Sequence, residues 1–398
     1  MNLEQLRTRI GDPPPRGFPT LEFEKRVTRA QQLMHEQKLD ALVVTAPPNF
    51  RYFSGLETQF WESPTRPWFI LVPRTGAPIA VVPEISAPEV QRTWIKDVRS
   101  WPAPRPKDDG LSLLASVIAS TERTWGRVGW ELGREMTLRM PVIDFLALQD
   151  SCRGVEFVDG SPTLWKARQV KSQLEIDHLR YICRLASVAY EALAERTWSG
   201  QSEMEIAREA RVLLHELGAD SVPFLPVISG RDGVSQIVCG PGKRTVADGD
   251  LIFIDTGATF DGYFCDFDRI YSVGRLSSEA KKAHEALWQA TEAALRALRP
   301  GQTAHDLWAI MSPILEAAGA RGNNVGRLGH GLGLQLTEPP SNMPGDFTVL
   351  QSGMVMTIEP GMEFAPGKMI VHEENVVITE EGCELLTLRA PREIWNVA

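Results

Sequence analysis

The sequence lacks the features of several classes of protein. It has no run of about 20 apolar residues, the length a membrane-spanning helix needs, although 43% of its 398 residues are hydrophobic. Its first residues, MNLEQLRTRIGDPPPRGFP, hold charges and prolines but no apolar signal-peptide core. We therefore expect a protein without membrane spans that resides in the cytoplasm.

Cysteine and positive charge are also scarce. The five cysteines are odd in number, scattered, and form no C-x-x-C pair, so we expect reduced and mostly buried thiols. Asp and Glu outnumber Lys and Arg by 51 to 42, which gives a formal net charge of −9. Because no basic stripe with interleaved aromatic residues is present, nucleic acid is not an expected partner.

Length and patterning predict two domains of mixed α/β (α+β) structure, divided near residue 165, because 398 residues exceed the usual size of one core. In the first part, periodicity and turn residues predict helices at 21–37 and about 110–121, and strands at 41–45, 67–73, 78–83 and 126–132. In the second part they predict helices at about 173–197, 203–217, 278–298 and 304–318, and strands at 223–229, 250–256, 353–359 and 369–379.

The most informative segment is GDLIFIDTGATFDGYFCDFDRIYSVG, at 249–274, which predicts two strands joined by an Asp-Gly turn. With a two-residue turn, Asp255 faces Asp268 across the ladder, and Asp266 projects from the same face. The surrounding apolar residues predict burial of both strands. Buried carboxylates repel one another unless a cation or a proton lies among them, so the cluster predicts a metal site rather than a solvated acidic surface.

Three further segments supply matching donors. GHGLGLQLTEPP places His330 between glycines that permit close approach of the backbone. MTIEPGM ends a strand with Glu359 before a Pro-Gly stop, and VHEENVVIT offers Glu373 or Glu374 at the start of another strand. Carboxylates and an imidazole suit manganese, cobalt, iron or zinc, and do not suit a copper thiolate site.

The motif order D-x-G, GY-x-x-D, GHG-x-G, EPG and a Glu before VVIT resembles the creatinase/prolidase/aminopeptidase P family of pita-bread folds, peptidase family M24. This resemblance implies a creatinase-like N-terminal α/β domain at 1–165 and a pita-bread metallopeptidase domain at 166–398. It also implies two divalent metal ions, with manganese the first choice and cobalt or zinc the alternatives. The implied ligands are Asp255, Asp266, His330, Glu359 and Glu373.

The resemblance further implies hydrolysis of a C–N amide bond in dipeptides or other short peptides, as in Xaa-Pro dipeptidases, by a homodimer. Two metal ions about 3.5–4 Å apart lower the pKa of a shared water and polarise the substrate carbonyl. Two alternatives stay open. One is a small-solute enzyme of the same fold, resembling ectoine hydrolase or dimethylsulfoniopropionate lyase, and the other is a metal-free creatinase-like amidinohydrolase.

The chain departs from the family pattern at positions that handle protons. Family peptidases carry one histidine shortly before the first metal strand and another after GHG-x-G, whereas this chain has Ile237 or Val238 and then Thr337. The arginine usually found two residues before the last glutamate is replaced by Val371. Since such acid-base groups contribute typically about 10²–10⁴ in rate, their loss favours slower peptide cleavage or a different substrate.

Candidates for the remaining roles follow from these gaps. Asp268 replaces the usual Thr or Ser and is expected beside the ligands, as a base, as a binder of a substrate amine, or as a carboxyl that needs its own proton. His372 is the candidate replacement for a lost proton shuttle, although strand alternation points it away from Glu373, and a structural histidine is the alternative. We expect substrate contacts from Thr337 and from Arg231, in the SGRDG turn. For Arg231, a plain turn residue is the alternative.

The loop FSGLETQFWESPTRPW, at 53–68, supplies three more candidates for substrate contact: Trp61, Arg66 and Trp68. In the family, such loops often reach the site of a neighbouring subunit. The alternative is that the two tryptophans only anchor the loop to the core.

Overall fold

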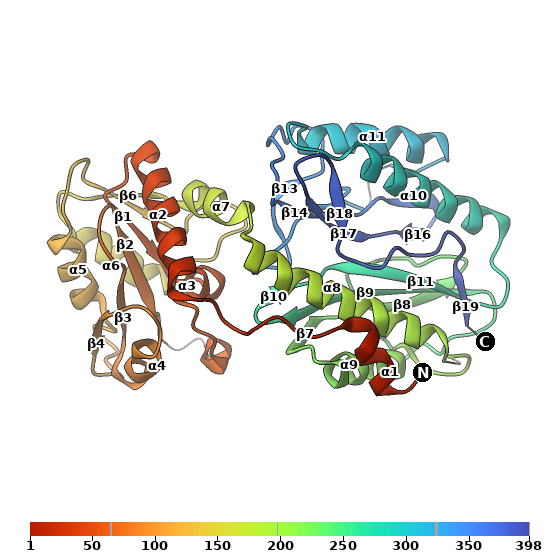
Figure 1. Ribbon diagram of the computed structural model, residues 1–398, viewed down its shortest axis with the longest axis horizontal. Coiled ribbons are helices and arrows are strands. Elements are labelled where there is room, and N and C mark those ends of the chain that lie inside the picture. Colours follow the sequence, from red (N-terminus) through yellow and green to blue (C-terminus); the bar gives the residue numbers. More distant parts are fainter. Residues whose placement is uncertain (64–65, 197, 323–324, 398) are drawn as a thin grey trace. The chain divides into compact units, whose positions relative to one another are not determined.

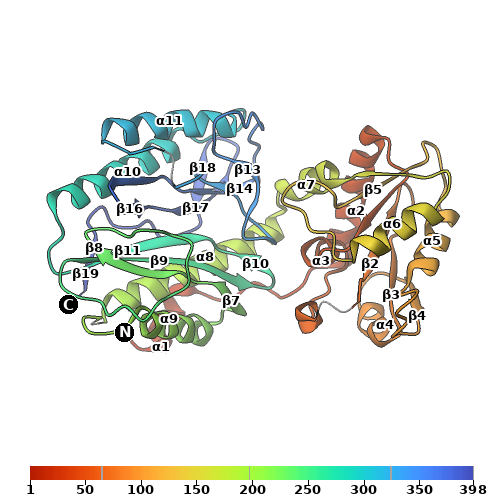
Figure 2. The same cartoon turned by 180° about the vertical axis from the view of Figure 1, so that it is seen from behind.

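A computed structural model of the chain describes residues 1–63, 66–196, 198–322 and 325–397. These residues form two compact units (Figures 1 and 2). The N-terminal unit consists of residues 15–168, and the C-terminal unit consists of residues 1–14 together with 169–398. The sequence division near residue 165 had grouped residues 1–14 with the first domain. Within the described ranges, no helix combines the length and the apolar character needed to cross a membrane.

The N-terminal unit is built on one mixed sheet with the strand order β4-β3-β2-β1-β5-β6. Its strands are β1 (Ala41–Val44), β2 (Phe69–Pro73), β3 (Ile79–Pro83), β4 (Asp97–Trp101), β5 (Arg127–Trp130) and β6 (Glu156–Asp159). Its helices are α2 (Thr20–Gln37), α3 (Pro47–Ser54), α4 (Ala87–Gln91), α5 (Leu111–Ser120), α6 (Val142–Ser151) and α7 (Ser161–Gln169). Every residue of β1 is buried, as its continuous apolar run predicts for a central strand.

The C-terminal unit contains two larger sheets, with the strand orders β10-β9-β11-β19 and β13-β12-β14-β17-β18; β7 and β8 also pair with β9, and β15 and β16 form a separate ladder. Its helices are α1 (Leu3–Ile10), α8 (Gln173–Ala194), α9 (Glu203–Leu217), α10 (Ser278–Ala297) and α11 (Ala304–Ala317). Its strands are β7 (Ser221–Phe224), β8 (Val227–Arg231), β9 (Asp250–Phe260), β10 (Tyr263–Phe264), β11 (Phe267–Val273), β12 (His330–Gly331), β13 (Glu338–Ser341), β14 (Val355–Ile358), β15 (Gly361–Ala365), β16 (Lys368–Val371), β17 (Glu374–Ile378), β18 (Cys383–Leu385) and β19 (Trp395–Val397).

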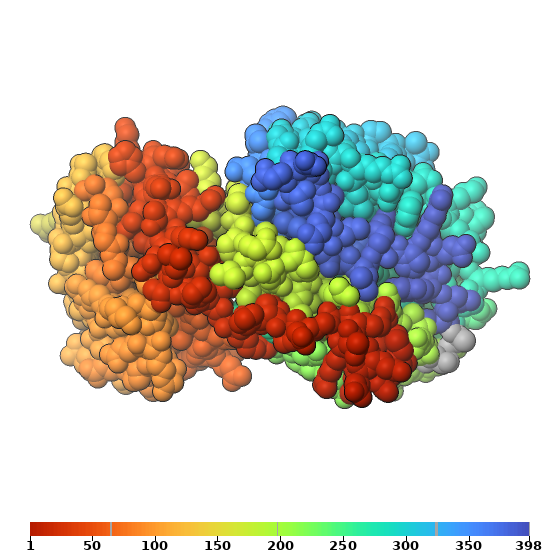
Figure 3. All heavy atoms as spheres, in the orientation of Figure 1, coloured from red at the N-terminus to blue at the C-terminus, as the bar shows by residue number. Residues whose placement is uncertain are grey.

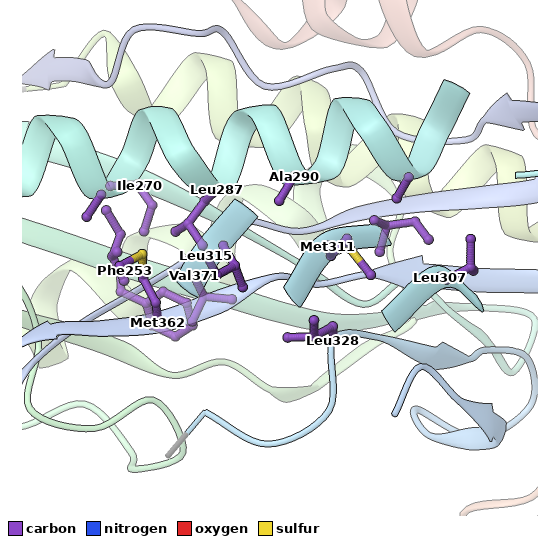
Figure 4. Packing of buried hydrophobic residues seen from close by; sticks show 14 of the residues in the cluster. Phe253, Ile270, Leu287, Ala290, Leu307, Met311, Leu315, Leu328, Met362 and Val371 are labelled. Atoms are coloured by element: carbon purple, nitrogen blue, oxygen red, sulfur yellow. The ribbon is translucent and has the colours of Figure 1, made fainter. Parts of the chain in front are cut away.

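The sheets of this unit lie between two helical layers, α8 with α9 on one side and α10 with α11 on the other (Figures 1 and 2). On α10, Leu287 and Ala290 are fully buried one turn apart, and they pack with Phe253 of β9 and Met311 of α11 (Figure 4). Small residues on α10 allow close approach of the helix to the strands. The strands that carry the acidic residues therefore rest on a rigid apolar core.

Capping residues fix where the long helices begin. Ser172 accepts a hydrogen bond from the backbone of Glu175, whose carboxylate accepts one from the Ser172 backbone N–H. Ser202 and Glu205 form the same capping box at the start of α9. Each box satisfies backbone donors that a helix start leaves unpaired, and it agrees with the predicted starts of both helices.

Helix α1 joins the C-terminal unit through arginine contacts. The Arg7 guanidinium donates to the Glu216 carbonyl at 2.6 Å, and Arg184 of α8 donates to the Arg9 carbonyl at 2.8 Å. Figure 3 shows these first residues on the surface of the unit, in dark red beside green segments. An eight-residue helix gave too short a periodicity for the sequence to predict.

Two predicted strands are each divided in two. The strand predicted at 223–229 is β7 followed by β8, because Pro226 between them has no N–H for the ladder. The strand predicted at 369–379 is β16 followed by β17, with the break at His372 and Glu373. The second break ends the regular alternation of side chains at the residue expected to bind metal.

Candidate metal centre

The hairpin formed by β9, β10 and β11 has the predicted register. Tyr263 pairs with Phe260, so Asp261 and Gly262 make a two-residue turn, and both have positive φ. Asp255 then pairs directly with Asp268 across the β9 and β11 ladder. All residues of β9 and β11 are buried, and Asp266, which lies between β10 and β11, is buried as well. Three carboxylates, those of Asp255, Asp266 and Asp268, therefore lie inside the unit.

The second sheet brings the other predicted ligands to these carboxylates. His330 lies on β12, Glu359 follows β14, and Glu373 precedes β17. His330 Nε2 lies 3.3 Å from Asp266 Oδ2 and 3.9 Å from Glu359 Oε2. Potential ligand atoms of Asp266, His330 and Glu373 all lie within 4.8 Å of one another, which is close enough to share an ion.

The orientation of His330 follows from its hydrogen bonds. Its Nδ1 lies 2.8 Å from the Gly331 carbonyl, and because a carbonyl only accepts, Nδ1 carries the proton. The lone pair of Nε2 then points toward the carboxylates. The His330 backbone N–H donates to Thr357 Oγ1 at 3.0 Å, so a hydroxyl on β14 holds the backbone of His330.

The electrostatics of the cluster are dominated by burial. Burial, reinforced by the charges of neighbouring carboxylates, raises the pKa of Asp255, Asp268 and Glu373 well above the usual range. Burial also raises the pKa of Asp266, whereas the charge of Arg327 opposes that rise. Burial raises the pKa of Glu359 to about 7. The protein alone therefore disfavours the charged forms of all these carboxyls.

An asparagine on β17 secures the backbone of Asp266. Asn375 Oδ1 accepts from the Asp266 N–H at 3.0 Å, and its Nδ2 donates to the Asp266 carbonyl. Cys183 of α8 donates to the same Oδ1. The sequence analysis did not identify Asn375. The sequence shows that Asn375 lies two residues after Glu373, but it does not show that the Asn375 side chain reaches the backbone of Asp266.

Arg269 supports Glu373 from behind the cluster. Its guanidinium donates to the Glu373 carbonyl at 2.8 Å and forms a fully buried ion pair with Glu374 at 3.0 Å. Arg389 also pairs with Glu374. Glu374 is thus neutralised by arginines, which leaves Glu373 as the glutamate that faces the centre, in agreement with the sequence-based choice between the two.

His372 faces away from the cluster. Its Nε2 lies 2.8 Å from Arg389 Nη1 and accepts from it, because a guanidinium only donates. Its Nδ1 lies 3.2 Å from Thr291 Oγ1 on α10. Burial and the charge of Arg389 lower the pKa of His372 well below its usual value. The geometry corresponds to the structural alternative for His372.

The two other substrate candidates of this unit have different surroundings. Thr337 lines a cavity of about 540 Å³ that opens on Asp255, Asp266, His330 and Glu359. Arg231 is exposed and lies at the end of β8, where it pairs with Asp250, five residues before Asp255. It is not among the described residues that line the cavity.

The three candidates of the N-terminal unit lie around a cluster of aromatic rings. Trp68 is only 2% exposed and packs 4.8 Å from Trp61 between ring centroids. Arg139 stacks on Trp61 and donates to the Arg66 carbonyl. This packing agrees with an anchoring role for the tryptophans, and substrate contact by the loop stays a prediction. Residues 64 and 65 of the predicted loop lie outside the described residues.

Arg327 was missed by the sequence analysis. It lines the same cavity, and its guanidinium donates to Thr337 Oγ1 at 3.1 Å and to Ser341 Oγ at 3.4 Å. The apolar part of the wall includes Phe224 and Leu336. A sequence signal existed, since Arg327 precedes the GHG motif by two residues, but a lone arginine in a turn is usually a surface residue.

Comparison with known families decides the class of this centre. The family described as metallopeptidase family M24 matches residues 177–380, just over half of the chain. The chain belongs to metallopeptidase family M24. The creatinase/prolidase N-terminal domain matches residues 26–170. The predicted family and the predicted fold class are therefore confirmed.

Relatives of M24 match the chain over nearly its whole length. The probable dipeptidase PepE of Mycobacterium tuberculosis is 29% identical over 384 residues, 95% of this chain and 98% of the relative. The Xaa-Pro dipeptidase of Pyrococcus furiosus is 28% identical over 373 residues, 94% and 100% of the two chains. The crystal structure of dipeptidase PepE from Mycobacterium ulcerans is similar with a TM-score of 0.83 at 28% identity, over 96% of this chain and 99% of that one.

The residues of this M24 member fit a divalent metal cofactor. Asp255 Oδ1, Asp268 Oδ2 and Glu373 Oε1 are buried oxygens without a hydrogen-bond partner among the described residues. Unsatisfied buried carboxylate oxygens are costly unless a cation compensates them. Oxygen donors with one imidazole are the ligand set that manganese, cobalt or zinc accepts. As an M24 member, the chain is a metal-dependent hydrolase.

A substitution of Gly329, the residue before His330, would test this geometry. Gly329 has φ +126, and a Cβ there would lie 2.2 Å from the Thr357 carbonyl oxygen. We expect Gly329→Ala to displace the His330 backbone and to lower kcat/KM by about 10²-fold, as a 1 Å misplacement can. Steady-state kinetics and metal analysis check this. Gly345→Ala is the control, because Gly345 has φ +88 but open space around it; equal losses in both variants would contradict the contact argument.

Proposed function

We propose that this chain is a dinuclear metal-dependent dipeptidase that hydrolyses the amide bond of Xaa-Pro dipeptides and related short peptides. The observation that carries the proposal is the enclosed set of carboxylates around His330, which borders a cavity of about 540 Å³. Relatives of the same length are named dipeptidase and Xaa-Pro dipeptidase. A cavity of this size suits a ligand of two residues.

The proposed ligands are Asp255, Asp266, His330, Glu359 and Glu373, and the proposed cofactor is a pair of divalent ions with manganese as the first choice. Four carboxylate ligands balance the charge of two such ions. When bound, two metal ions lower the pKa of a water and polarise the substrate carbonyl. We further propose a homodimer, which the family resemblance alone supports.

The side chains of this unit account for ligand geometry and substrate enclosure. Asn375 and Arg269 hold the backbones of Asp266 and Glu373, so the carboxylates keep their positions while charge changes at the centre. The apolar wall, which includes Phe224 and Leu336, gives the substrate side chains a dry surface to pack against. Asp268 is proposed as a buried carboxylate beside the ligands rather than as a ligand.

The test is release of proline from Ala-Pro by protein stripped of metal, with and without added manganese, cobalt or zinc. We expect release only with metal, and about two ions bound per chain at full activity. Gly-Ala and Leu-Leu serve as comparison substrates that separate preference for Xaa-Pro bonds from general dipeptidase activity. No hydrolysis of any dipeptide by protein that holds two ions would overturn the proposal and favour a small-solute enzyme of the same fold.

A further inference from the structure

One wall of the metal cavity is an irregular segment, residues 235–241, which lies between β8 and β9 in the chain. Ile237 and Val238 of this segment line the cavity. Ile237 and Cys239 pack against the apolar core, whereas Val238 between them is 77% exposed. Because an irregular segment has no ladder of backbone hydrogen bonds along its length, the contacts at its two ends decide where this wall stands.

The first end of the segment is joined to β16. The Val234 N–H donates to the Met369 carbonyl at 3.0 Å, and the Met369 N–H donates to the Val234 carbonyl at 2.7 Å. The two residues therefore form a short antiparallel bridge. This pair of backbone hydrogen bonds fixes the place where the segment begins.

The second end is held by a buried carboxylate. Glu203, the first residue of α9, is only 5% exposed. Its Oε2 accepts from the Gly242 N–H at 2.9 Å, and its Oε1 accepts from the backbone N–H and the hydroxyl of Ser229 on β8, each at 2.7 Å. The Gly242 carbonyl also accepts from the Met204 N–H at 3.1 Å. One carboxylate therefore ties the end of the segment to a strand that pairs with β9, the strand of Asp255.

Arg244 adds a second tie to the same sheet. Its Nη1 donates to Ser229 Oγ at 2.7 Å, and its two Nη atoms donate to the two carboxylate oxygens of Asp250 at 2.6 and 2.8 Å. Asp250 begins β9, five residues before Asp255. The cavity wall and the strand of a proposed metal ligand thus belong to one hydrogen-bonded network, which sets the position of the wall relative to the metal centre.

The carboxylate of Glu203 suits this task because both of its oxygens accept. Hydrogen bonds to a charged group are also roughly twice as strong as those between neutral groups. A glutamine amide accepts on its oxygen and only donates from its nitrogen, so in Glu203→Gln the amide nitrogen would face the N–H of Gly242 or of Ser229. The Ser229 N–H belongs to a strand inside the sheet, and we therefore expect the contact with Gly242 to be lost.

We propose that Glu203, supported by Arg244, is a positioning residue that holds segment 235–241 in the conformation that forms the cavity wall. The inference rests on the proposed function, because it takes the cavity as the substrate site. A released segment spends part of its time away from the cavity, and the apparent affinity for substrate falls in proportion to the fraction that stays in place. Once substrate is bound the wall is in place, so the rate of the chemical step changes little.

Steady-state kinetics with Ala-Pro measures the effect on substrate binding. Because one hydrogen bond to a charged group is lost, we expect Glu203→Gln to raise KM by about 10-fold and to change kcat by less than about 2-fold. Bound metal should equal that of the wild type. Unchanged KM in Glu203→Gln would overturn the inference.

Glu205→Gln is the matched control for kinetics. Glu205 lies in the same helical turn and accepts from the backbone N–H and the hydroxyl of Ser202. Its substitution removes one carboxylate and weakens the start of α9 without a change at segment 235–241, so KM should stay at the wild-type value. An equal rise of KM in Glu203→Gln and Glu205→Gln would mean that only the stability of α9 matters, and would overturn the inference.

Cys239 reports whether the segment opens. It is half-buried, and Cys383, which is also half-buried but lies on β18, is the internal reference. With alkylation measured by mass spectrometry, we expect Glu203→Gln to increase the rate at Cys239 by about 10-fold relative to Cys383. An unchanged ratio would overturn the inference, whatever the kinetics show.

Arg244→Gln separates opening of the segment from a change in thiol reactivity. Burial raises the pKa of the Cys239 thiol, and the charge of Glu203 raises it further, so Glu203→Gln alone favours the reactive thiolate. Arg244→Gln removes a positive charge and cannot favour the thiolate. Faster alkylation in both variants supports release of the segment, and faster alkylation in Glu203→Gln alone would overturn the inference. Arg244→Gln also tests the network if Glu203→Gln does not fold.

Binding of an uncleavable analogue separates this inference from the proposed function. In an analogue of Ala-Pro, a methylene replaces the scissile carbonyl, and calorimetry with the metal-loaded protein gives its Kd without turnover. If Ala-Pro is not cleaved but the Kd of the analogue rises by about 10-fold in Glu203→Gln, the peptidase proposal fails and the role of Glu203 stands. If the Kd is the same in Glu203→Gln and wild type, the role of Glu203 fails even when Ala-Pro is cleaved.

Discussion

Glu359→Gln is expected to remove metal and activity together. Glu359 follows β14 and its Oε2 lies 3.9 Å from His330 Nε2, within the carboxylate cluster. Glutamine has the same shape but no negative charge, so it leaves the packing intact and reduces the charge that compensates two divalent ions. We expect bound metal to fall from about two ions per chain to one or fewer.

The loss of rate follows from the loss of metal. Metal ions contribute several kcal/mol of transition-state stabilisation, and each 1.36 kcal/mol is a factor of ten in rate. We therefore expect kcat/KM for the best dipeptide to fall by at least about 10³-fold. Dialysis followed by elemental analysis measures the bound metal, and steady-state kinetics at saturating manganese measures the activity.

Glu380→Gln is the matched control, because Glu380 is exposed and lies in the turn after β17. It removes the same charge without a change at the centre, and both metal content and kcat/KM should equal those of the wild type. A Glu359→Gln protein that keeps two ions and full activity would remove Glu359 from the ligand set.

The hairpin was predictable because its constraints are local. A two-residue Asp-Gly turn fixes the register, and the register alone decides that Asp255 faces Asp268. The burial of both strands followed from their apolar residues. For the same reason the sequence predicted a carboxylate cluster correctly before any residue from the second sheet was considered.

The surroundings of the cluster were not predictable from periodicity. Arg327, Asn375 and Arg269 act through contacts with residues that are 10 to 109 positions away in the chain, and no local pattern reports such contacts. The break between β16 and β17 also escaped notice, although the polar residues 372–375 (HEEN) separate the two apolar runs there.

For His372, the alternation of side chains along the strand predicted the correct direction of the ring. Alternation pointed its ring away from Glu373, and the ring does contact Thr291 and Arg389 instead. The sequence still offered it as a proton shuttle, because the two family histidines were missing and no other histidine was adjacent to a ligand. Proximity along the chain was a poorer guide than the face of the strand.

The metal-free protein is expected to lose stability as the pH rises from 7 to 8. Burial raises the pKa of Asp255, Asp266, Asp268 and Glu373 well above the usual range, and that of Glu359 to about 7. A carboxyl with a raised folded-state pKa contributes stability that is fully present below its unfolded-state pKa of about 4. That contribution is lost as the pH rises through the folded-state pKa.

The size of the effect follows from the linkage between proton binding and folding. One pKa unit corresponds to about 1.4 kcal/mol, and a shift of two units lowers the Tm of a unit of this size by about 5–10 °C. Thermal unfolding in chelator at pH 5, 6, 7 and 8 measures it. Carboxyls with lowered pKa values, such as Asp306, lose their contribution only as the pH falls toward 4 and below. The buried His284 and His372, whose pKa values are lowered, destabilise the fold below about pH 6.5, so the loss of stability is read between pH 7 and 8.

Added manganese should reverse this dependence, because metal binding requires deprotonated ligands and strengthens as the pH rises. The stabilisation by metal is then largest at pH 8, where the metal-free protein is weakest. Asp268→Asn should raise the Tm of the metal-free protein at pH 8 by removing one buried charge, whereas Asp150→Asn, at an exposed position on α6, should not. A metal-free Tm that stays constant or rises between pH 7 and 8 would mean that the carboxylates are compensated by something other than metal ions.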